Sequence, residues 1–233
     1  MTSLSTHRKL LVHDLGRRPY AEVLELQRNL CRARVERRHD DDILLLVEHD
    51  PVYTLGRGTR DSSLPLAPEL LRKRGAEVFE IERGGDVTFH GPGQLVGYPI
   101  IDLAQQRQDL HWYLRELEGA LIDALEVLDI AADRNPGKTG VWTGGRKIAS
   151  IGVHVKQWVT LHGFALNVTT DLAWFDWIVP CGIADVQMTS VGRELDTTGN
   201  SLKDIDLRAR EAVVEALGRR FGRSQDSAAL PTL

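Results

Sequence analysis

The chain has 233 residues, of which 42% are hydrophobic, enough for one substantial buried core. Lys and Arg number 29 against 33 Asp and Glu, and the net charge of -4 argues against nucleic acid as a partner. Two cysteines are too few for a disulfide framework, MTSLSTHRKL lacks the apolar stretch of a signal peptide, and no run approaches the roughly 18 apolar residues of a membrane span. We expect a soluble, cytoplasmic protein without a membrane partner, with a single domain over residues 1–223 and a disordered tail over residues 224–233.

The first half of the chain predicts helices mixed with strands. Apolar residues near helical spacing, short apolar runs and glycine or proline boundaries provide the signals. We expect a helix over 20–38, a strand buried on both faces over 43–47, a loop over 49–60, a short helix over 65–74, and strands over 77–81 and 94–101.

The second half predicts two helices around a hairpin. Leucines recur at intervals of three and four after Asp109, which fits an N-cap, and a last helix is expected from Ser201 to Gly222. Residues 147–155 and 158–168 predict an antiparallel hairpin, whereas 169–182 has no clean period and predicts a partly buried loop. The fold class that follows is α/β (α+β), with a mixed central sheet flanked by helices.

The run from Arg83 to Tyr98, RGGDVTFHGPGQLVGY, is the most informative segment. Its glycines let the main chain adopt positive φ and approach a ligand closely. Arg83 supplies a fixed positive charge and His90 a titratable one, so the segment can hold a charged or carbonyl-bearing ligand. A glycine-rich turn between two strands is the structural alternative.

Cys181, in Ile-Val-Pro-Cys-Gly, lies in a loop and is the candidate nucleophile. A thiol of pKa about 8.5 is only about a tenth thiolate near pH 7.5, so it needs a nearby cation or base. Lys147, His90 and His162 are the candidates for that partner. Cys31, on a helical face, is interpreted as a buried structural residue.

Lys147 opens a predicted strand and would act on the thiol through its charge. An ammonium about 4 Å from the thiolate, at an effective dielectric of about 20, contributes roughly 4 kcal/mol before desolvation opposes it. The same lysine would then donate a proton and take one back during turnover. An exposed strand-end lysine is the alternative, and histidine is the commoner partner of a catalytic thiol.

Four motifs carry a family resemblance. RGGDVTFHGPGQLVGYPI, GRKIASIGVHV, LHGFALNV and IVPCGIADVQMTSVGREL occur in this order and at suitable separations. Together with EHDPVYTLGRG, they closely resemble the lipoyl(octanoyl) transferase family over roughly residues 49–195. Asp50 departs from the proline or small residue that is usual in that loop, which bears on the loop's shape and not on the chemistry.

The resemblance implies an octanoyltransferase with the fold of the biotin and lipoate protein ligases. Such an enzyme takes an octanoyl group from octanoyl-acyl carrier protein onto its cysteine and passes it to a lysine of a lipoyl domain, the first step of endogenous protein lipoylation. The family's catalytic residues fall on Cys181 and Lys147. Its substrate-binding residues fall on Arg83, Gly84, Gly85, Asp86, Val87, Thr88, Phe89, His90, Ser150, Ile151, Gly152, Gly163, Phe164 and Ala165.

The implied acceptors are the lipoyl domains of 2-oxoacid dehydrogenases and the glycine cleavage H protein, and the enzyme is expected to be a monomer. We expect no cofactor, no metal and no ATP, because thioester exchange is nearly balanced and aminolysis to an amide runs downhill. Backbone amides near residues 83–90 or 150–152 are candidates for an oxyanion site. Small side chains at residues 163–165 are expected to leave room for the acyl chain, with core packing as the alternative for Phe164.

Three other functions stay open on the residues alone: an ATP-dependent lipoate or biotin ligase, a non-catalytic binding module and a thioesterase. Cys181 discriminates against the ligase, which activates its acid as an adenylate and needs no cysteine. Trp174 and Trp177 are expected to pack in an apolar loop. Arg57 is either a surface arginine or a contact to a partner protein or its phosphopantetheine. The sequence does not identify the residues that close the far end of an acyl pocket.

Overall fold

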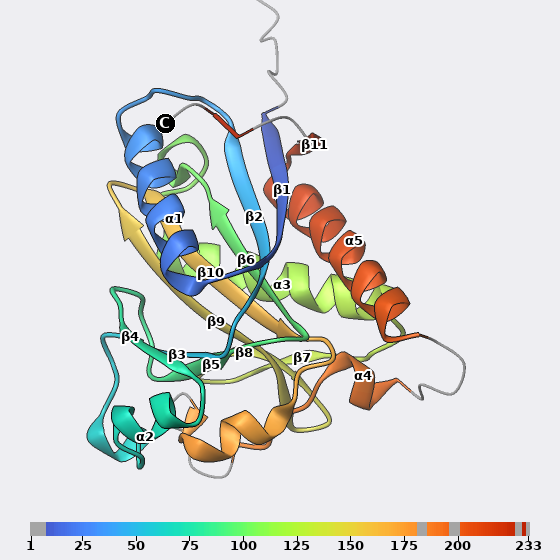
Figure 1. Ribbon diagram of the computed structural model, residues 1–233. Coiled ribbons are helices and arrows are strands. Elements are labelled where there is room, and N and C mark those ends of the chain that lie inside the picture. Colours follow the sequence, from blue (N-terminus) through green and yellow to red (C-terminus); the bar gives the residue numbers. More distant parts are fainter. Residues whose placement is uncertain (1–7, 181–185, 196–200, 227–229, 232–233) are drawn as a thin grey trace, which may run out of the picture.

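The computed structural model describes residues 8–180, 186–195, 201–226 and 230–231. In these segments, one sheet contains eight strands in the order β11-β1-β2-β6-β10-β9-β8-β7 (Figure 1). The strands are β1 (Lys9–Arg18), β2 (Asp42–His49), β6 (Gln94–Ile100), β7 (Asp133–Asn135), β8 (Lys138–Thr143), β9 (Arg146–Lys156), β10 (Val159–Asn167) and β11 (Ser224–Asp226). The β1 strand is parallel to β2 and β11, and the other neighbours are antiparallel, so the sheet is mixed, as predicted.

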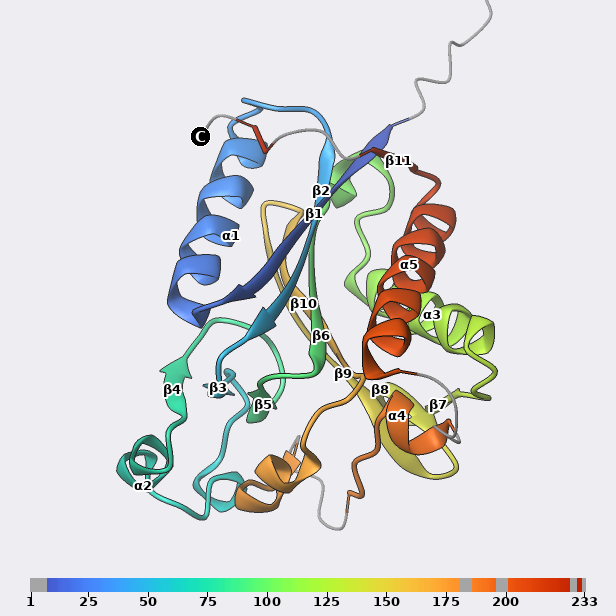
Figure 2. The same cartoon turned by 45° about the vertical axis from the view of Figure 1, so that its right-hand side comes forward.

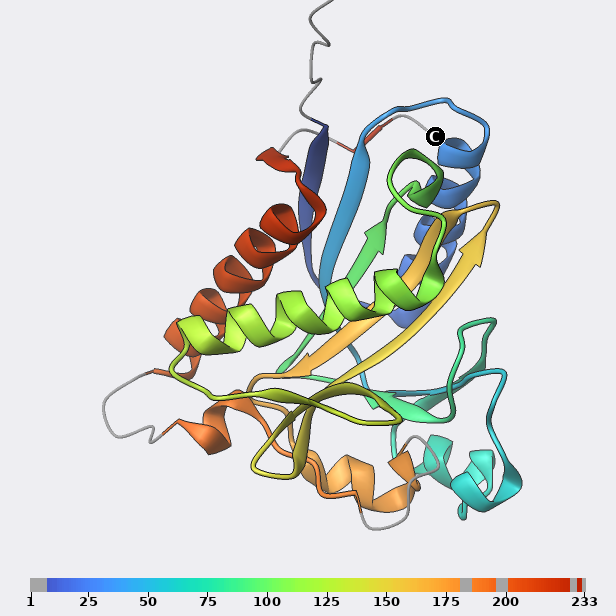
Figure 3. The same ribbon diagram turned by 180° about the vertical axis from the view of Figure 1, so that it is seen from behind.

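Helices cover both faces of this sheet. The helix α1 (Tyr20–Val35) lies on one face, and α3 (Leu110–Val127) and α5 (Leu202–Phe221) lie on the other (Figures 2 and 3). Each face has its own buried apolar cluster, because the side chains of a strand alternate between the two faces. None of the helices in the described segments is both long and apolar enough to cross a membrane.

A second, smaller sheet with short helices lies at one end of the large sheet (Figure 1). Its strands have the order β4-β3-β5 and include the middle of the glycine segment. The elements of this region are β3 (Val52–Leu55), β4 (Glu77–Glu80), β5 (Thr88–His90), η1 (Asp61–Ser63), α2 (Pro68–Lys73), η3 (Leu172–Trp177) and α4 (Val191–Glu194), and η2 (Leu103–Gln105) follows β6.

The capping signals of the sequence are confirmed. The Asp109 side chain accepts a hydrogen bond from the Trp112 amide, and Ser201 accepts one from the Asp204 amide. Gly222 ends α5 in the left-handed conformation, with φ of 61°. These residues satisfy backbone groups that the ends of a helix leave without an intrahelical partner.

Two expectations about irregular segments were wrong. The predicted loop over 49–60 contains β3, which pairs with β4 and β5. Residues 224–226, which we expected in a disordered tail, form β11 beside β1. The strands β1, β7 and β8 were not predicted, because charged residues and glycines interrupt their alternation.

Candidate functional site

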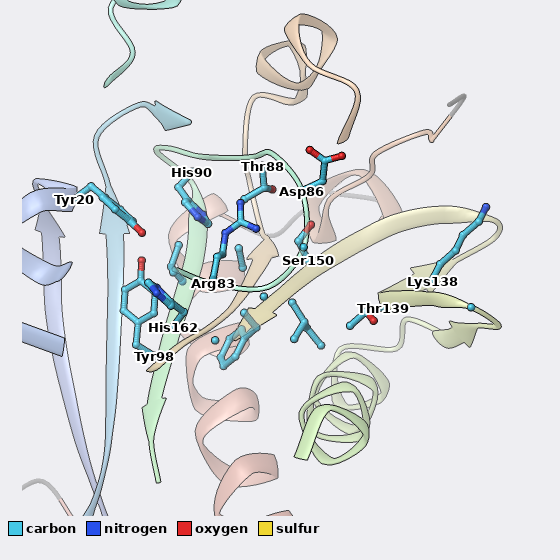
Figure 4. Close-up of a pocket in the computed structure, with 18 residues that line it drawn as sticks. Tyr20, Arg83, Asp86, Thr88, His90, Tyr98, Lys138, Thr139, Ser150 and His162 are labelled. Atoms are coloured by element: carbon cyan, nitrogen blue, oxygen red, sulfur yellow. The ribbon is translucent and has the colours of Figure 1, made fainter. Parts of the chain in front are cut away.

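A small cavity lies against the face of the large sheet that α1 covers. Its volume is about 260 Å³, slightly below the roughly 300 to 1,000 Å³ of drug-sized ligand sites, which suits one slender ligand. Strands β6, β9 and β10 form its floor, and the glycine segment lies along one side (Figure 4). Aromatic side chains and the glycine segment supply eight of the lining residues: Tyr20, Tyr98, Phe164, Arg83, Gly85, Asp86, Thr88 and His90. The others come from strands β6, β8, β9 and β10 and from the turn before β8: Val96, Gly137, Lys138, Thr139, Ser150, Ile151, Gly152, His162, Gly163 and Ala165.

Arg83 holds the glycine segment in place. Its guanidinium is buried and donates to the backbone oxygen of Thr54 at 2.6 Å and to the Thr54 hydroxyl at 2.9 Å. The next residue, Gly84, donates its N–H to the Val153 carbonyl of β9 at 2.8 Å. The segment is therefore fixed between the small sheet and the large one, with Gly85 in a positive-φ conformation (86°).

Some of the predicted substrate-binding residues of this segment point away from the cavity. Gly84, Val87 and Phe89 do not line it, and Val87 and Phe89 are fully buried in a separate apolar cluster. The Phe89 ring stacks on Trp174 with ring centroids 5.1 Å apart, and Trp174 contacts Trp177, which confirms the packing interpretation of both tryptophans.

His90 is an uncharged hydrogen-bond donor. Gln94 uses its Nε2 to donate to Phe89 and Asn167, so its Oε1 accepts from His90 Nδ1 at 2.8 Å. Burial, reinforced by the nearby His49, lowers the pKa of His90 to about 3. The titratable positive charge that we expected at this position is therefore absent at neutral pH.

Strand pairing places the small residues of β9 and β10 on the cavity floor. Ser150 lies opposite Ala165 and Gly152 opposite Gly163, and directly opposed residues share a face. A Cβ on Gly163 would collide with the Gly97 carbonyl of β6, so close strand packing also requires glycine at this position of the cavity floor. Phe164 packs in the core on the α3 side and also borders the cavity.

Lys147 is buried near the Thr139 end of the cavity, although it does not line it. Only 1% of the residue is exposed, which overturns the alternative of an exposed lysine. Its side chain runs past Gly140, where a Cβ would lie 2.7 Å from Cε and 3.2 Å from Nζ. The ring centroid of Trp142 lies 5.6 Å from Nζ, a distance that permits a cation–π interaction.

Cys181 lies outside the described residues, but described residues that precede and follow it in the chain form hydrogen bonds toward the site. Before it, the Val179 N–H donates to the Ser63 carbonyl at 2.9 Å, and the Ser63 hydroxyl donates to Asp86 of the glycine segment at 2.6 Å. After it, the Lys147 N–H donates to the Gln187 carbonyl at 2.8 Å. Val179, which precedes Cys181 in the chain, is thus connected through Ser63 to the glycine segment, and Gln187, which follows it, is bonded to Lys147.

The second cysteine, Cys31, has the buried position that we expected. It is 1% exposed on α1, and burial raises the pKa of its thiol to about 11. This thiol stays protonated at neutral pH and has no nucleophilic character.

The structure adds cavity residues that were not among the predicted substrate-binding residues. Tyr20 begins α1, and Tyr98 lies on β6. His162, which the sequence named only as a candidate partner of the thiol, lines the cavity with an unusual φ of 57°, and its backbone N–H donates to Gln27 Oε1 at 3.0 Å. Neither periodicity nor spacing reveals such residues, because they gather from three separate elements.

Comparison with known proteins gives the family. The model of the lipoyl protein ligase A/B catalytic domain matches residues 19–216. An octanoyltransferase of Rubrobacter xylanophilus is 56% identical over 182 residues, 77% of this chain and 81% of that protein. One of Nostoc sp. is 45% identical over 208 residues, 89% of this chain and 92% of that protein.

Solved structures show the same fold at low sequence identity. A lipoate-protein ligase A bound with ATP has a TM-score of 0.73 at 16% identity, and the match covers 97% of this chain and 90% of that protein's chain. A second structure is that of a bi-partite lipoate protein ligase from Thermoplasma acidophilum, studied with its E2 lipoyl domain. It also has a TM-score of 0.73 at 16% identity, and the match covers 97% of this chain and 88% of that protein's chain.

The chain therefore belongs to the lipoyl protein ligase A/B catalytic domain family. Three relatives that are 45–56% identical to it over 75–89% of its length are octanoyltransferases, which confirms the resemblance inferred from the sequence motifs.

Proposed function

We propose that this octanoyltransferase of protein lipoylation works through a thioester on Cys181. The donor is octanoyl-acyl carrier protein, and the acceptor is a lysine of a lipoyl domain. The observation that supports this most strongly is the pair of ties on either side of Cys181, because they connect its segment both to the cavity wall at Asp86 and to Lys147.

Both steps of the transfer proceed without ATP, and their bonds and protons balance as follows. In the first, the Cys181 thiolate attacks the donor's thioester carbonyl, a new C–S bond forms, and the carrier thiolate leaves and takes up a proton. In the second, the acceptor amine attacks the acyl-enzyme carbonyl, loses a proton as the amide forms, and releases the Cys181 thiolate. The buried ammonium of Lys147 stabilises the thiolate in both steps and exchanges these protons.

The cavity is the proposed site of the octanoyl chain. Its floor carries small or apolar side chains, and its volume suits a single short chain. For the oxyanion, the candidates among the glycine-segment amides become fewer, because the N–H groups of Gly84 and Val87 already donate to Val153 and Asp86. The remaining amides of residues 83–90 and 150–152 stay candidates.

The partners follow from the reaction. The proposed acceptors are the lipoyl domains of 2-oxoacid dehydrogenases and the glycine cleavage H protein, and the enzyme acts as a monomer in the cytoplasm. A hollow beside the Cys181 segment, lined by Val179, Pro180 and Thr189, offers an approach for the acceptor that does not pass through the acyl cavity.

An exchange of Cys181 separates this mechanism from that of an ATP-dependent ligase. Cys181→Ser is expected to abolish octanoyl transfer from the carrier protein to an apo lipoyl domain, and ATP with free octanoate is expected not to restore it. A Cys31→Ser variant is the matched control, because that buried thiol takes no part. Full activity of Cys181→Ser would overturn the proposal.

A further inference from the structure

We propose that Tyr20 and Tyr98 form the end wall of the acyl cavity and set the length of the chain that the enzyme accepts. The inference rests on the proposed function, which places the octanoyl chain in this cavity. It assigns a role to two residues that lie in different elements, at the start of α1 and on β6.

The cavity has an exposed end and a closed end. At the exposed end, Gly137 and Thr139 are accessible to solvent, and Thr139 adjoins Gly140, against which the Lys147 side chain lies. At the other end, Tyr20 is 1% exposed and Tyr98 is 3% exposed. Tyr20 and Tyr98 lie across the cavity from Thr139 (Figure 4). Because the reacting carbonyl belongs near Lys147, the methyl end of the chain lies at the two tyrosines.

Tyr98 is fixed by a chain of hydrogen bonds. His49 Nδ1 donates to the Arg18 carbonyl at 2.9 Å, which leaves Nε2 as an acceptor. The Tyr98 hydroxyl donates to that Nε2, with 2.8 Å between the two atoms. Because His49 is fully buried and is itself held by the Arg18 carbonyl, the Tyr98 ring cannot swing aside without breaking its bond to His49.

Tyr20 is fixed by aromatic packing. Pro19 precedes it at the N-cap of α1, and the ring lies with its centroid 5.1 Å from that of His49 and 5.3 Å from that of Phe79. It also stacks on His90 at 6.1 Å. Rings packed on several sides form a wall that yields little to a longer chain.

The two histidine rings beside the wall, His49 and His162, are uncharged and therefore compatible with an alkyl chain. Burial lowers the pKa of His49 to about 4, and that of His162 also to about 4 although the Glu82 carboxylate lies 3.9 Å away. Both rings are neutral at physiological pH.

A wall is needed because attraction alone favours longer chains. At about 0.8 kcal/mol for each buried methylene, a chain of ten carbons would bind about 15-fold more tightly than one of eight if the cavity continued. Discrimination against the longer chain must come from a barrier at the closed end.

The test compares chain lengths in variants of the wall. The kcat/KM for acyl carrier protein loaded with chains of six, eight, ten or twelve carbons is measured with an apo lipoyl domain as acceptor. The variants are Tyr20→Leu and Tyr98→Leu. Tyr113→Leu is the matched control, because Tyr113 is an equally buried tyrosine in the core on the α3 side and lies outside the cavity.

We expect both wall variants to raise the decanoyl-to-octanoyl ratio by about 15-fold, and Tyr113→Leu to leave it unchanged. Ala165→Val, which narrows the floor from the middle, is expected to shift the preference to the six-carbon chain. An unchanged ratio in folded Tyr20→Leu and Tyr98→Leu, or an equal rise in Tyr113→Leu, would overturn the proposal.

Binding of the free acids separates this proposal from the catalytic one. Dissociation constants for octanoate and decanoate, measured by calorimetry, should show the same change of ratio in the wall variants. If that change is found and no acyl-enzyme forms, the thioester mechanism is contradicted and the role of the tyrosine wall is supported. If the acyl-enzyme forms and neither the kinetic nor the binding ratio changes, the role of the tyrosine wall is contradicted and the thioester mechanism is supported.

Discussion

At the scale of single residues, the proposed mechanism depends on a buried lysine. Lys147 is 1% exposed, and burial of an ammonium is costly unless the surroundings are arranged for it. Its neighbours include the Trp142 ring, and its backbone pairs with the segment that follows Cys181. A buried cation beside a nucleophilic thiol is the arrangement that favours the thiolate.

Removal of this cation should therefore change the titration of Cys181. Lys147→Ala is expected to raise the pKa of the thiol and to lower octanoyl transfer by about 100-fold or more. The rate of Cys181 alkylation against pH measures the first effect. Lys156→Ala, an exposed lysine at the other end of the same strand, is the control, and an alkylation profile identical to that of the wild type in Lys147→Ala would remove the electrostatic role.

At the scale of elements, β8 shapes the space for Lys147. The pairing of β8 with β9 shifts register between Val141 and Trp142, which face Ala149 and Lys147, so the extra residue lies on β9 next to Lys147. The Gly140 N–H donates to Glu118 of α3 at 3.1 Å, and Glu118 is a buried carboxylate that also accepts from Arg115 at 2.6 Å. The helix α3 thus holds the strand against which the lysine lies.

A side chain at Gly140 should displace the lysine. In Gly140→Ala the new Cβ would meet Lys147 Cε at 2.7 Å and the Ala149 carbonyl at 2.6 Å, and a shift of about 1 Å in a catalytic group costs about 100-fold in rate. Steady-state kinetics should show the loss in kcat. Gly145→Ala is the control, because Gly145 also has positive φ (79°) but has open space around it. Equal losses in both variants would assign the effect to backbone strain alone.

The sequence predicted some elements well, for reasons that are local. The β2 strand is an uninterrupted apolar run, and α3 and α5 carry both an apolar period and caps. The hairpin of β9 and β10 was also predicted. By contrast, β3 has only four residues, and its pairing with β4 and β5 depends on the tertiary fold.

The candidate site was predictable only where a motif marks it. Five of the eight predicted substrate-binding residues of the glycine segment line the cavity, and the substrate-binding role of the segment and the roles of Cys181 and Lys147 stay predictions. The wall of Tyr20 and Tyr98 was not predictable, because the two residues are 78 positions apart and meet only through the packing of α1 on the sheet.

At the scale of the whole molecule, the cavity region contains three buried histidines. Burial lowers the pKa of His90 to about 3 and those of His49 and His162 to about 4, against an ordinary value of 6.5. In the unfolded chain these rings take up protons below about pH 6.5, whereas in the folded protein they stay neutral. Each of them therefore favours unfolding as the pH falls from 6.5 toward 4.

The free energy of unfolding should accordingly decrease below pH 6.5, by up to about 1.4 kcal/mol per pH unit for each histidine. Urea unfolding at pH 7.5, 6.5 and 5.5 measures this slope in a range where few carboxylates titrate. His49→Gln should flatten the slope between pH 6.5 and 5.5, even if it lowers the stability at pH 7.5. A slope identical to that of the wild type would contradict the neutral, buried state of His49.

Intact mass spectrometry after mixing with octanoyl-acyl carrier protein tests the thioester mechanism most directly. We expect a single added octanoyl group that is absent in Cys181→Ala and is discharged when apo lipoyl domain is added. Transfer to the lipoyl domain without any adduct on the enzyme, in samples quenched during turnover, would contradict it and indicate direct transfer between the two partner proteins.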